Sequence, residues 1–230
     1  MTDCHRAVPP VQTSELATAQ AVRRDRIISA ATRLGHLGYD GCQMRAVAAA
    51  AGVAASTVYL YFPSKDDLLL ACLYRWMHEF GDAVDTSARV STDGHTRLLL
   101  VFELLTTRLS STPGLADAMI RPYLYAHGTA AEHAQRVRDE LIGIFSTAMG
   151  DDYPPALRHQ IADMLADVWA TNVSSVAQQR IPLTDLTTRL SHMLTVVERR
   201  EYDRNRPATP ATETHGHPGR SHTASRSLAV

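Results

Sequence analysis

Residues 47–65 read VAAAAGVAASTVYLYFPSK, and this stretch decides the fold class of the chain. Four consecutive alanines precede Gly52, and an aromatic run follows that ends close to Lys65, the only lysine of the sequence. A helix-turn-helix needs a small residue where its two helices approach closely, a glycine four positions later for the turn, and an apolar residue six positions further on. Ala48, Gly52 and Val58 have this spacing. The spacing alone fits an alanine-rich helical hairpin without a role in DNA binding equally well.

The aromatic end of the stretch favours the helix-turn-helix. A second helix over residues 55–61 places several side chains on or near its outer face, and the hydroxyls of two tyrosines beside them can reach phosphates. These side chains are Ser56, Thr57, Tyr59, Leu60 and Tyr61. Tyr61 is equally compatible with packing in the core, and core packing explains Phe62 better than a DNA contact does.

The next helix is expected to begin with a capping pattern. Ser64 occupies the N-cap position, and Asp67 follows at the third helical position. Lys65 then lies in the first turn, where the backbone N–H groups also point toward any anion. Because lysine carries a compact and adjustable point charge, it suits a phosphate better than a base edge. We therefore predict that Lys65 binds a DNA phosphate.

The formal net charge of -1 hides an uneven distribution of charge. Residues 16–65 carry four more basic than acidic side chains, whereas the rest of the chain carries five more acidic than basic ones. The basic segment is therefore the place to look for a nucleic-acid contact.

The run GYDGCQMRAVAAAAGVAASTVYLYFPSKDDLL resembles the DNA-binding domain of the TetR family of bacterial one-component regulators. The family signature is a glycine turn, then T-[VIL]-Y-x-Y-F, then [PS]-[SN]-K-x-x-L. Gly52, residues 57–62, residues 63–65 and Leu68 match it in order within one window. The resemblance implies an all-α protein in which an N-terminal three-helix DNA-binding domain precedes a helical ligand-binding and dimerisation domain.

The resemblance also assigns DNA-binding roles by position. The matching residues are Arg23, Arg24, Arg26, Arg45, Ala55, Ser56, Thr57, Tyr59, Leu60, Tyr61 and Lys65. It implies that the tyrosines and the lysine hold phosphates, that Arg45 contacts the backbone, and that Ser56, Thr57 and Leu60 face base edges. The arginine cluster at 23–26 is expected to reach the flanking groove, although such a cluster also fits a solvated helix start. Ala55 replaces a lysine that is frequent in the family, so fewer phosphate contacts are expected.

Three further segments, QMRAVA, VWATN and DAMIRPYLYAH, look similar to the actinobacterial repressors of cholesterol and steroid catabolism within the TetR family. This closer resemblance implies a hydrophobic effector, either steroid-like or a fatty acyl thioester. It further implies a homodimer that sets two recognition helices about 34 Å apart on a palindromic operator. Effector binding is expected to favour a conformation with the wrong spacing, so that the DNA is released.

The rest of the chain shows helical periodicity, without a convincing alternating strand. We expect a flexible polar arm over residues 1–20, the helix-turn-helix domain over 21–66 and the effector-binding and dimerisation domain over 67–204. Residues 205–230 are rich in Pro, Thr, Ser, Gly and His, and they are expected to be disordered.

The helical domain is expected to contain a ligand cavity, because Pro-Gly, Arg-Pro and Gly breaks interrupt its helices and interrupted packing leaves concave space. Asn172 is the candidate polar anchor, since an asparagine on an apolar stripe needs a hydrogen-bond partner. The candidate lining residues are Phe102, Met119, Tyr123, Phe145, Met164, Val168, Trp169 and Asn172. Ordinary core packing is the alternative for each of them.

The last two helices, expected over about 155–180 and 184–204, correspond to the pair that forms the dimer interface in TetR-like proteins. The apolar residues on the last of them are Leu186, Leu190, Met193, Leu194 and Val197. Packing within one subunit is the alternative for this face.

Other function classes are poorly supported by the sequence. It lacks G-x-S-x-G, a phosphate-binding glycine loop, G-x-G-x-x-G and H-E-x-x-H, so we expect no enzyme activity and no cofactor. His215 and His217 lack acidic or Cys ligands at useful spacing, and no metal is expected. The three cysteines lie far apart and the first residues lack the apolar core of a signal peptide, which predicts a cytoplasmic protein. A helical dimer that binds a small molecule, or acts as an enzyme, without touching DNA remains the alternative.

Overall fold

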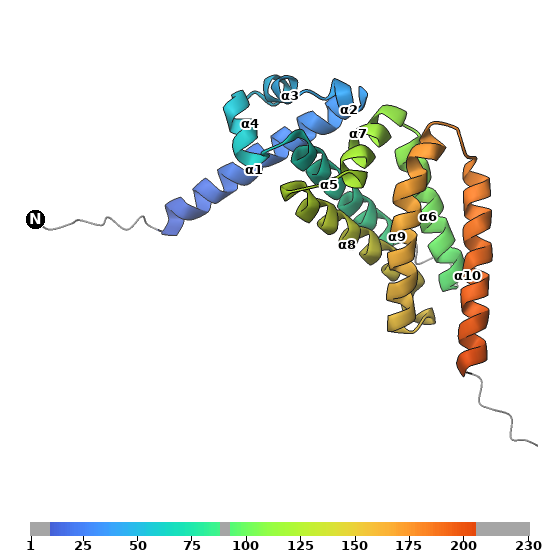
Figure 1. Ribbon diagram of the computed structural model, residues 1–230. Helices are drawn as coiled ribbons and strands as arrows, with labels where there is room; N and C mark the ends of the chain where they lie inside the picture. Colours follow the sequence, from blue (N-terminus) through green and yellow to red (C-terminus); the bar gives the residue numbers. More distant parts are fainter. Residues whose placement is uncertain (1–9, 88–92, 206–230) are drawn as a thin grey trace, which may run out of the picture. The chain divides into compact units, whose positions relative to one another are not determined.

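The computed structural model describes residues 10–87 and 93–205, and within these ranges the chain is helical and contains no strand (Figure 1). The elements are α1 (Pro10–Gly35), α2 (Gly38–Gly41), α3 (Met44–Ala51), α4 (Ala55–Tyr61), α5 (Lys65–Ser87), α6 (Gly94–Ser110), α7 (Pro113–Leu124), α8 (Thr129–Met149), the 3-10 helix η2 (Gly150–Asp152), α9 (Pro155–Ala177) and α10 (Leu183–Asn205). The predicted all-α class is confirmed.

The helix-turn-helix consists of α3 and α4, which enclose an angle of 104°. Gly52 ends α3 in the left-handed conformation, with φ 65°, which a residue with a Cβ adopts only under strain. Ala48 on α3 and Val58 on α4 are both buried, and the two helices pack on each other, as the predicted spacing requires. Helix α1 packs across α3 and completes a three-helix unit.

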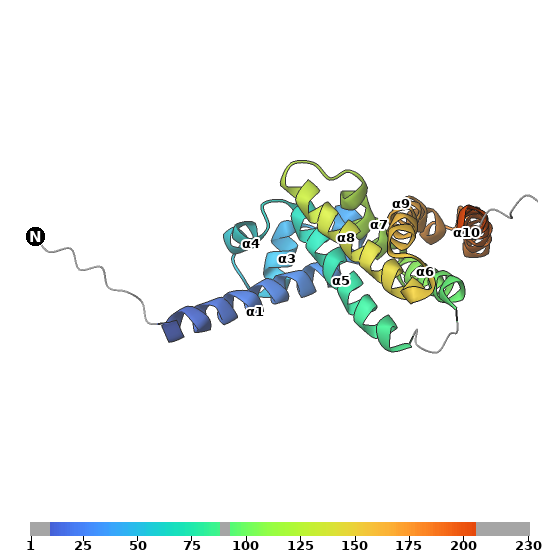
Figure 2. The ribbon, with the colours of Figure 1, turned by 90° about the horizontal axis from the view of Figure 1, so that it is seen from below.

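Helix α1 begins earlier than the sequence predicts. Residues 1–20 were expected to form an arm, but residues 10–20 are helical and only residues 1–9 lie outside the described part of the chain. Side chains 17–26 are exposed, whereas Ile27 and Ile28 are buried. Figures 1 and 2 show the amino-terminal half of α1 projecting away from the other helices. We predicted an arm here because residues 1–20 are mostly polar and show no apolar face at helical spacing.

The helical region behind the DNA-binding unit is assembled around α5 and α8. Helix α5 packs on α8 and α7, and α8 packs on α6 and α9. The predicted domain boundary after residue 66 falls in the first turn of α5, which therefore runs from one region into the other. In the core between these helices the rings of Phe102 and Phe145 stack, with centroids 5.9 Å apart.

Residues up to Leu194 form one compact unit, and the chain from Thr195 onward forms a second. Within the first unit, Leu186, Leu190 and Leu194 of α10 are buried. In the second unit α10 continues to Asn205. The predicted disordered tail lies outside the described residues, apart from Asn205 itself. None of the described helices alone has the length and apolar composition needed to cross a membrane.

Candidate DNA-binding site and effector region

Helix α4 presents an outer face that no other described part of the chain covers. Leu60 is 82% exposed and Tyr59 is 50% exposed, although burying large side chains such as these is favourable. Ser56 is exposed as well, and Thr57 is half-buried. Because Val58 on the opposite side is fully buried, α4 is seated firmly while this face stays open. An open, rigid face of this kind has the form of a recognition helix.

The remaining predicted DNA-binding residues occupy different environments. Arg45 on α3 is exposed and Ala55 is half-buried. Tyr61 is also half-buried, and its ring centroid lies 6.5 Å from that of the buried Phe62. A half-buried Tyr61 fits both the core packing and the DNA contact predicted for it, so the structure does not decide between them.

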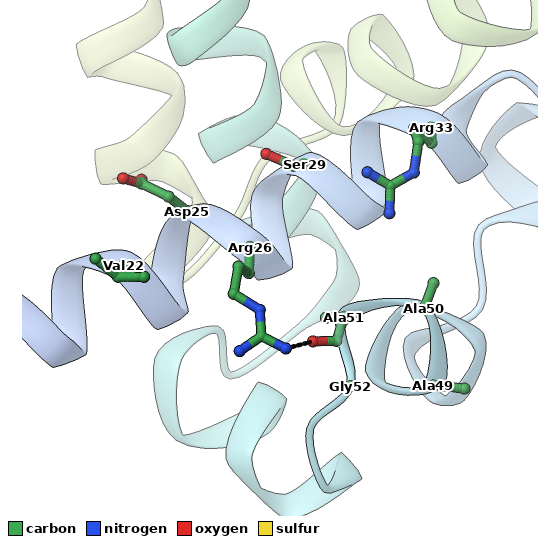
Figure 3. A pocket seen from close by; sticks show the side chains of 9 residues that line it. All are labelled: Val22, Asp25, Arg26, Ser29, Arg33, Ala49, Ala50, Ala51 and Gly52. Atoms are coloured by element: carbon green, nitrogen blue, oxygen red, sulfur yellow. Dashed lines mark hydrogen bonds between the residues drawn. The ribbon is translucent and has the colours of Figure 1, made fainter.

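The arginine cluster of α1 splits into three environments. Arg26 donates a hydrogen bond of 2.6 Å from Nη2 to the carbonyl oxygen of Ala51, at the carboxyl end of α3 (Figure 3). The groove where this contact lies, between α1 and the end of α3, has a volume of about 520 Å³. Arg24 lies over the ring of Phe62, 5.3 Å from its centroid. Arg23 is exposed. Arg26 therefore has a structural role, the capping of α3, which the sequence did not indicate, and its DNA contact stays a prediction.

The capping pattern predicted at the start of α5 is present. The amide of Asp67 donates to Oγ of Ser64 at 3.1 Å, and the amide of Ser64 donates to Oδ2 of Asp67 at 3.0 Å. Asp67 is fully buried, and its Oδ1 lies 3.1 Å from Nδ1 of His133 on α8. The capping box therefore also joins the start of α5, directly behind α4, to the helical region. No pattern in the sequence pointed to His133.

Lys65 has an intramolecular partner that the sequence did not reveal. Its Nζ donates to the backbone oxygen of Tyr39 at 2.9 Å and lies 3.6 Å from the centroid of the Tyr39 ring. An ammonium group has further N–H donors for a phosphate, so these contacts orient Lys65 and leave binding capacity. The phosphate contact itself stays a prediction.

Tyr39 in turn is held by α7. Its backbone amide donates to Asp117 at 2.9 Å, its hydroxyl donates to Asp66 at 2.6 Å, and the guanidinium of Arg121 lies 4.4 Å from its ring centroid. Burial and the hydrogen bond with Asp66 raise the pKa of Tyr39 to about 12. We call Tyr39, Asp66, Asp117 and Arg121 the junction cluster. It links Lys65 to the helical region.

The backbones also approach closely at this junction. A Cβ added to Gly114, in the first turn of α7, would lie 2.1 Å from the carbonyl oxygen of His36. No side chain fits at that distance. Glycine is therefore required for α7 to pack against the segment between α1 and α2.

The predicted effector-binding residues lie in or next to the core of the helical region. Phe102, Met119, Phe145 and Trp169 are fully buried. The half-buried members of the set are Tyr123, Met164, Val168 and Asn172. Phe102 and Phe145 contact one another, so core packing, the alternative for these two, is what the structure shows.

Of the polar groups in this set, the side-chain amide of Asn172 has a hydrogen-bond partner and the indole N–H of Trp169 has none among the described residues. The side-chain amide of Asn172 donates to the carbonyl oxygen of Val168 at 2.8 Å, one turn earlier in α9, so it has the partner that the sequence left open. Trp169 is fully buried, and its Nε1 has no acceptor among the described residues. A buried donor without a partner is rare and calls for an explanation. Trp169, not Asn172, is therefore the better candidate for a polar contact with an effector.

Two carboxylates one turn apart on α9, those of Asp163 and Asp167, bind an arginine of α8. Arg138 of α8 donates from Nη2 to Asp163 at 2.8 Å, and it also pairs with Asp167. Burial raises the pKa of Tyr123, and the nearby Arg138 partly offsets that shift. This ion-pair network explains why the two aspartates lie one turn apart on α9.

The expected dimer face requires a correction. Leu186, Leu190 and Leu194 are buried within their own subunit, so these three do not offer a free face to a second chain. Met193 is half-buried, and Val197, in the second unit, is half-buried as well. The leucine spacing indicated an apolar face correctly, but spacing cannot tell which surface covers it.

An open recognition helix behind a glycine turn, backed by a larger helical region, defines a helix-turn-helix DNA-binding regulator. Comparison with known families agrees. Residues 27–72 match the model described as bacterial regulatory proteins of the tetR family, and residues 92–197 match that of the tetracyclin repressor-like C-terminal domain. The chain belongs to the TetR family of transcriptional regulators.

Individual relatives refine this assignment. The chain is 35% identical over 179 residues to the HTH-type transcriptional repressor KstR of Mycobacterium tuberculosis, covering 77% of this chain and 81% of that protein. It is 34% identical over 177 residues to KstR of Rhodococcus jostii, covering 76% and 82%. Among solved structures, a TetR regulator from Rhodococcus sp. RHA1 gives a TM-score of 0.70 at 24% identity, covering 78% and 97%. FadR of Bacillus subtilis in complex with stearoyl-CoA gives 0.57 at 20%, covering 74% and 96%.

Proposed function

We propose that this protein is a homodimeric repressor that binds a palindromic operator through α4. The observation that carries the proposal is the open face of α4, where Leu60 and Tyr59 stay exposed although the opposite side of the helix is fully buried. Two relatives are transcriptional repressors, and they are 34 to 35% identical to this chain over 76 to 77% of its length. Ser56, Thr57 and Leu60 are the proposed base contacts, with phosphates held by Tyr59, Lys65 and Arg23.

The effector that we propose is a hydrophobic molecule of the steroid or fatty acyl class. The mycobacterial and rhodococcal relatives are KstR repressors, and a structure with the same fold was solved with stearoyl-CoA. In this chain the unpartnered Nε1 of Trp169 supplies a donor inside an apolar core. The stacked rings of Phe102 and Phe145 belong to the same set of proposed effector-binding residues.

The experiment that tests DNA binding is a fluorescence titration of the protein with DNA fragments from the region flanking its gene. We expect tight binding to a two-fold symmetric site and a logarithmic affinity that falls linearly with the logarithm of salt concentration. A folded protein that ignores every fragment at low salt would show that the proposal is wrong. Helix α4 would then serve a protein contact instead.

A second measurement tests the link between effector and DNA. Effector and operator must weaken each other's binding by the same factor, typically about 5- to 150-fold in allosteric proteins. The affinity for stearoyl-CoA, measured with and without operator DNA, should differ by that factor. Equal affinities would leave a DNA-binding protein without the proposed release mechanism.

A further inference from the structure

A cleft outside the predicted effector core lies where α1, α5 and α8 meet. Its volume is about 300 Å³. Its walls combine apolar side chains with a basic rim, and they comprise Arg24, Asp25, Ile28, Leu70, Ala71, Tyr74, Arg75, His78, His133 and Arg136. The cleft is thus built from one helix of the DNA-binding unit and two helices of the helical region.

Most of the basic groups in the cleft already have partners. Arg75 donates to Oγ of Ser29 at 3.0 Å and lies 3.6 Å from Glu79. His78 pairs with Glu140 at 3.0 Å, and His133 pairs with the buried Asp67. Each of these three side chains therefore already has a carboxylate partner within the chain.

Arg24 and Arg136 are different. Both are exposed, and among the side chains that the structure describes no carboxylate lies within ion-pair distance of either. They come from α1 and α8, so they approach the cleft from separate helices. Asp25 is the one carboxylate among the residues that line it. The cleft therefore offers two guanidinium groups that have no internal counter-ion.

Two guanidinium groups on one cleft suit a phosphate. Each guanidinium presents several N–H donors in a fixed plane, and charge-assisted hydrogen bonds to phosphate oxygens are stronger than those between neutral groups. The apolar surface beside this rim comes mainly from Tyr74, which is 39% exposed, whereas Ile28 and Leu70 lie behind it and are almost fully buried. The volume lies at the lower end of ordinary ligand pockets, so it suits part of a molecule, not a whole steroid.

We propose that the cleft between α1, α5 and α8 binds the phosphate group of an amphiphilic ligand through Arg24 and Arg136, with the adjoining carbon skeleton against the exposed ring of Tyr74. Two sources share this chemistry, namely a phosphorylated carrier attached to an acyl chain and the free phosphorylated carrier. The proposal goes beyond the proposed function because it adds a second binding region next to the DNA-binding unit.

The position of the cleft gives such a ligand a direct connection to DNA binding. A phosphate held by both arginines would join α1 to α8. Helix α1 also holds the end of α3 through the bond between Arg26 and Ala51. A ligand that changes the position of α1 relative to α8 would therefore change the setting of the helix-turn-helix as well.

The test uses calorimetric titration of the full chain with three probes, namely stearoyl-CoA, free coenzyme A and stearate. Coenzyme A carries the phosphates without the acyl chain, and stearate carries the acyl chain without phosphates. We expect the wild type to bind both phosphorylated probes. Arg136→Ala should weaken each by about 10- to 100-fold, the loss of one charge-assisted hydrogen bond, and should leave the affinity for stearate unchanged.

Two matched variants control the result. Arg136→Lys keeps the charge without the planar fork and should recover part of the affinity. Arg108→Ala removes an exposed arginine of α6 that does not line the cleft, and it should bind like the wild type. Melting curves of all variants check that they are folded.

Three outcomes would overturn the proposal. In the first, neither phosphorylated probe binds. In the second, Arg136→Ala binds coenzyme A as tightly as the wild type does. In the third, Arg136→Ala weakens operator binding and lowers its salt dependence, which would place Arg136 against DNA. Operator binding by the wild type without any probe is measured separately, so the loss of this site would leave the proposed repressor function standing.

Discussion

Large side chains are exposed on the outer face of α4 but buried in the core of the helical region. On α4, Leu60 and Tyr59 remain exposed, whereas Phe102, Met119, Phe145 and Trp169 in the helical region are completely buried. The face of α4 is therefore available for an intermolecular contact, whereas the large side chains of the helical region are covered by their own chain. Under the proposed function, DNA would meet an exposed face and the effector would contact buried side chains.

The proposed release of DNA depends on contacts that join the helix-turn-helix to the helical region. The junction cluster holds Lys65 through Tyr39, the capping box reaches His133 through Asp67, and Gly114 lets the backbones touch. Together these contacts join the start of α5, α2 and the segment between α1 and α2 to α7 and α8 of the helical region. Substitutions at these contacts therefore test most directly how the two regions are joined.

The largest effect is expected from Gly114→Ala. Its Cβ would meet the carbonyl oxygen of His36 at 2.1 Å, so the two regions must move apart, at a cost of about 3 kcal/mol in the free energy of unfolding. Urea denaturation measures this loss. Gly143→Ala is the matched control, because nothing lies within 4 Å of its added Cβ, and alanine in the interior of α8 should stabilise the protein slightly. Equal stabilities for the two variants would contradict the close approach.

A smaller loss, about 2 kcal/mol, is expected from Asp67→Asn. The substitution keeps the size of the side chain but weakens the bonds to Ser64 and His133 in a fully buried place. The free energy of unfolding again gives the answer. Asp151→Asn, on an exposed side chain, should change it by less than about 1 kcal/mol. If both substitutions cost the same, the buried link between α5 and α8 contributes nothing.

Lys65→Glu tests the DNA-binding surface itself. Replacing the predicted phosphate contact with a carboxylate should lower operator affinity by about tenfold or more, and the logarithmic salt dependence should become shallower by about one unit. Fluorescence titrations over a series of salt concentrations measure both quantities. Lys65→Met serves as the neutral comparison, and it should weaken binding less. An unchanged salt slope would leave Lys65 with only its contact to Tyr39.

Trp169→Phe probes the closed core. The phenylalanine removes an indole N–H that has no acceptor among the described residues, so stability without ligand should change by less than about 1.5 kcal/mol although the ring is smaller. Effector affinity should fall, because the donor proposed to contact the effector is lost. Thermal melting with and without stearoyl-CoA separates the two effects. Unchanged ligand stabilisation in the variant would remove Trp169 from the effector site.

The smallest effect concerns pH. Because the folded protein raises the pKa of Tyr39 from 10.0 to about 12, its protonated hydroxyl stabilises the fold fully below pH 10. That stabilisation is lost as the pH rises through 12. Wild type and Tyr39→Phe, compared by denaturation at pH 8 and pH 11, should differ less at pH 11. A constant difference would mean that Asp66 does not hold the hydroxyl proton.

The sequence predicted the DNA-binding half well because its contacts are local. The spacing of Ala48, Gly52 and Val58 fixes a turn within eleven residues, and the capping box spans only four. Each of these patterns has one favourable local geometry. Chain-local chemistry was therefore sufficient to identify the helix-turn-helix, and the resemblance to the TetR family added the function.

Local spacing did not show partners that lie farther along the chain. Arg26 was predicted to reach DNA; it also caps α3 at Ala51, and its DNA contact stays a prediction. The three leucines of α10 were assigned to a second subunit, but they are buried in their own. Helix α1 begins at Pro10, earlier than predicted. The prediction relied on an apolar face to locate the helix, and a helix can extend beyond the residues that carry such a face.

By itself the sequence determined an all-α chain with a glycine-centred helix pair, since backbone preferences and spacing operate between near neighbours. Only the tertiary structure decided that Tyr39 holds Lys65, that His133 meets Asp67, and that two arginines without counter-ions flank one cleft. Those pairings join residues up to about a hundred positions apart. Their free energy depends on how whole helices pack, and no short pattern in the chain records that packing.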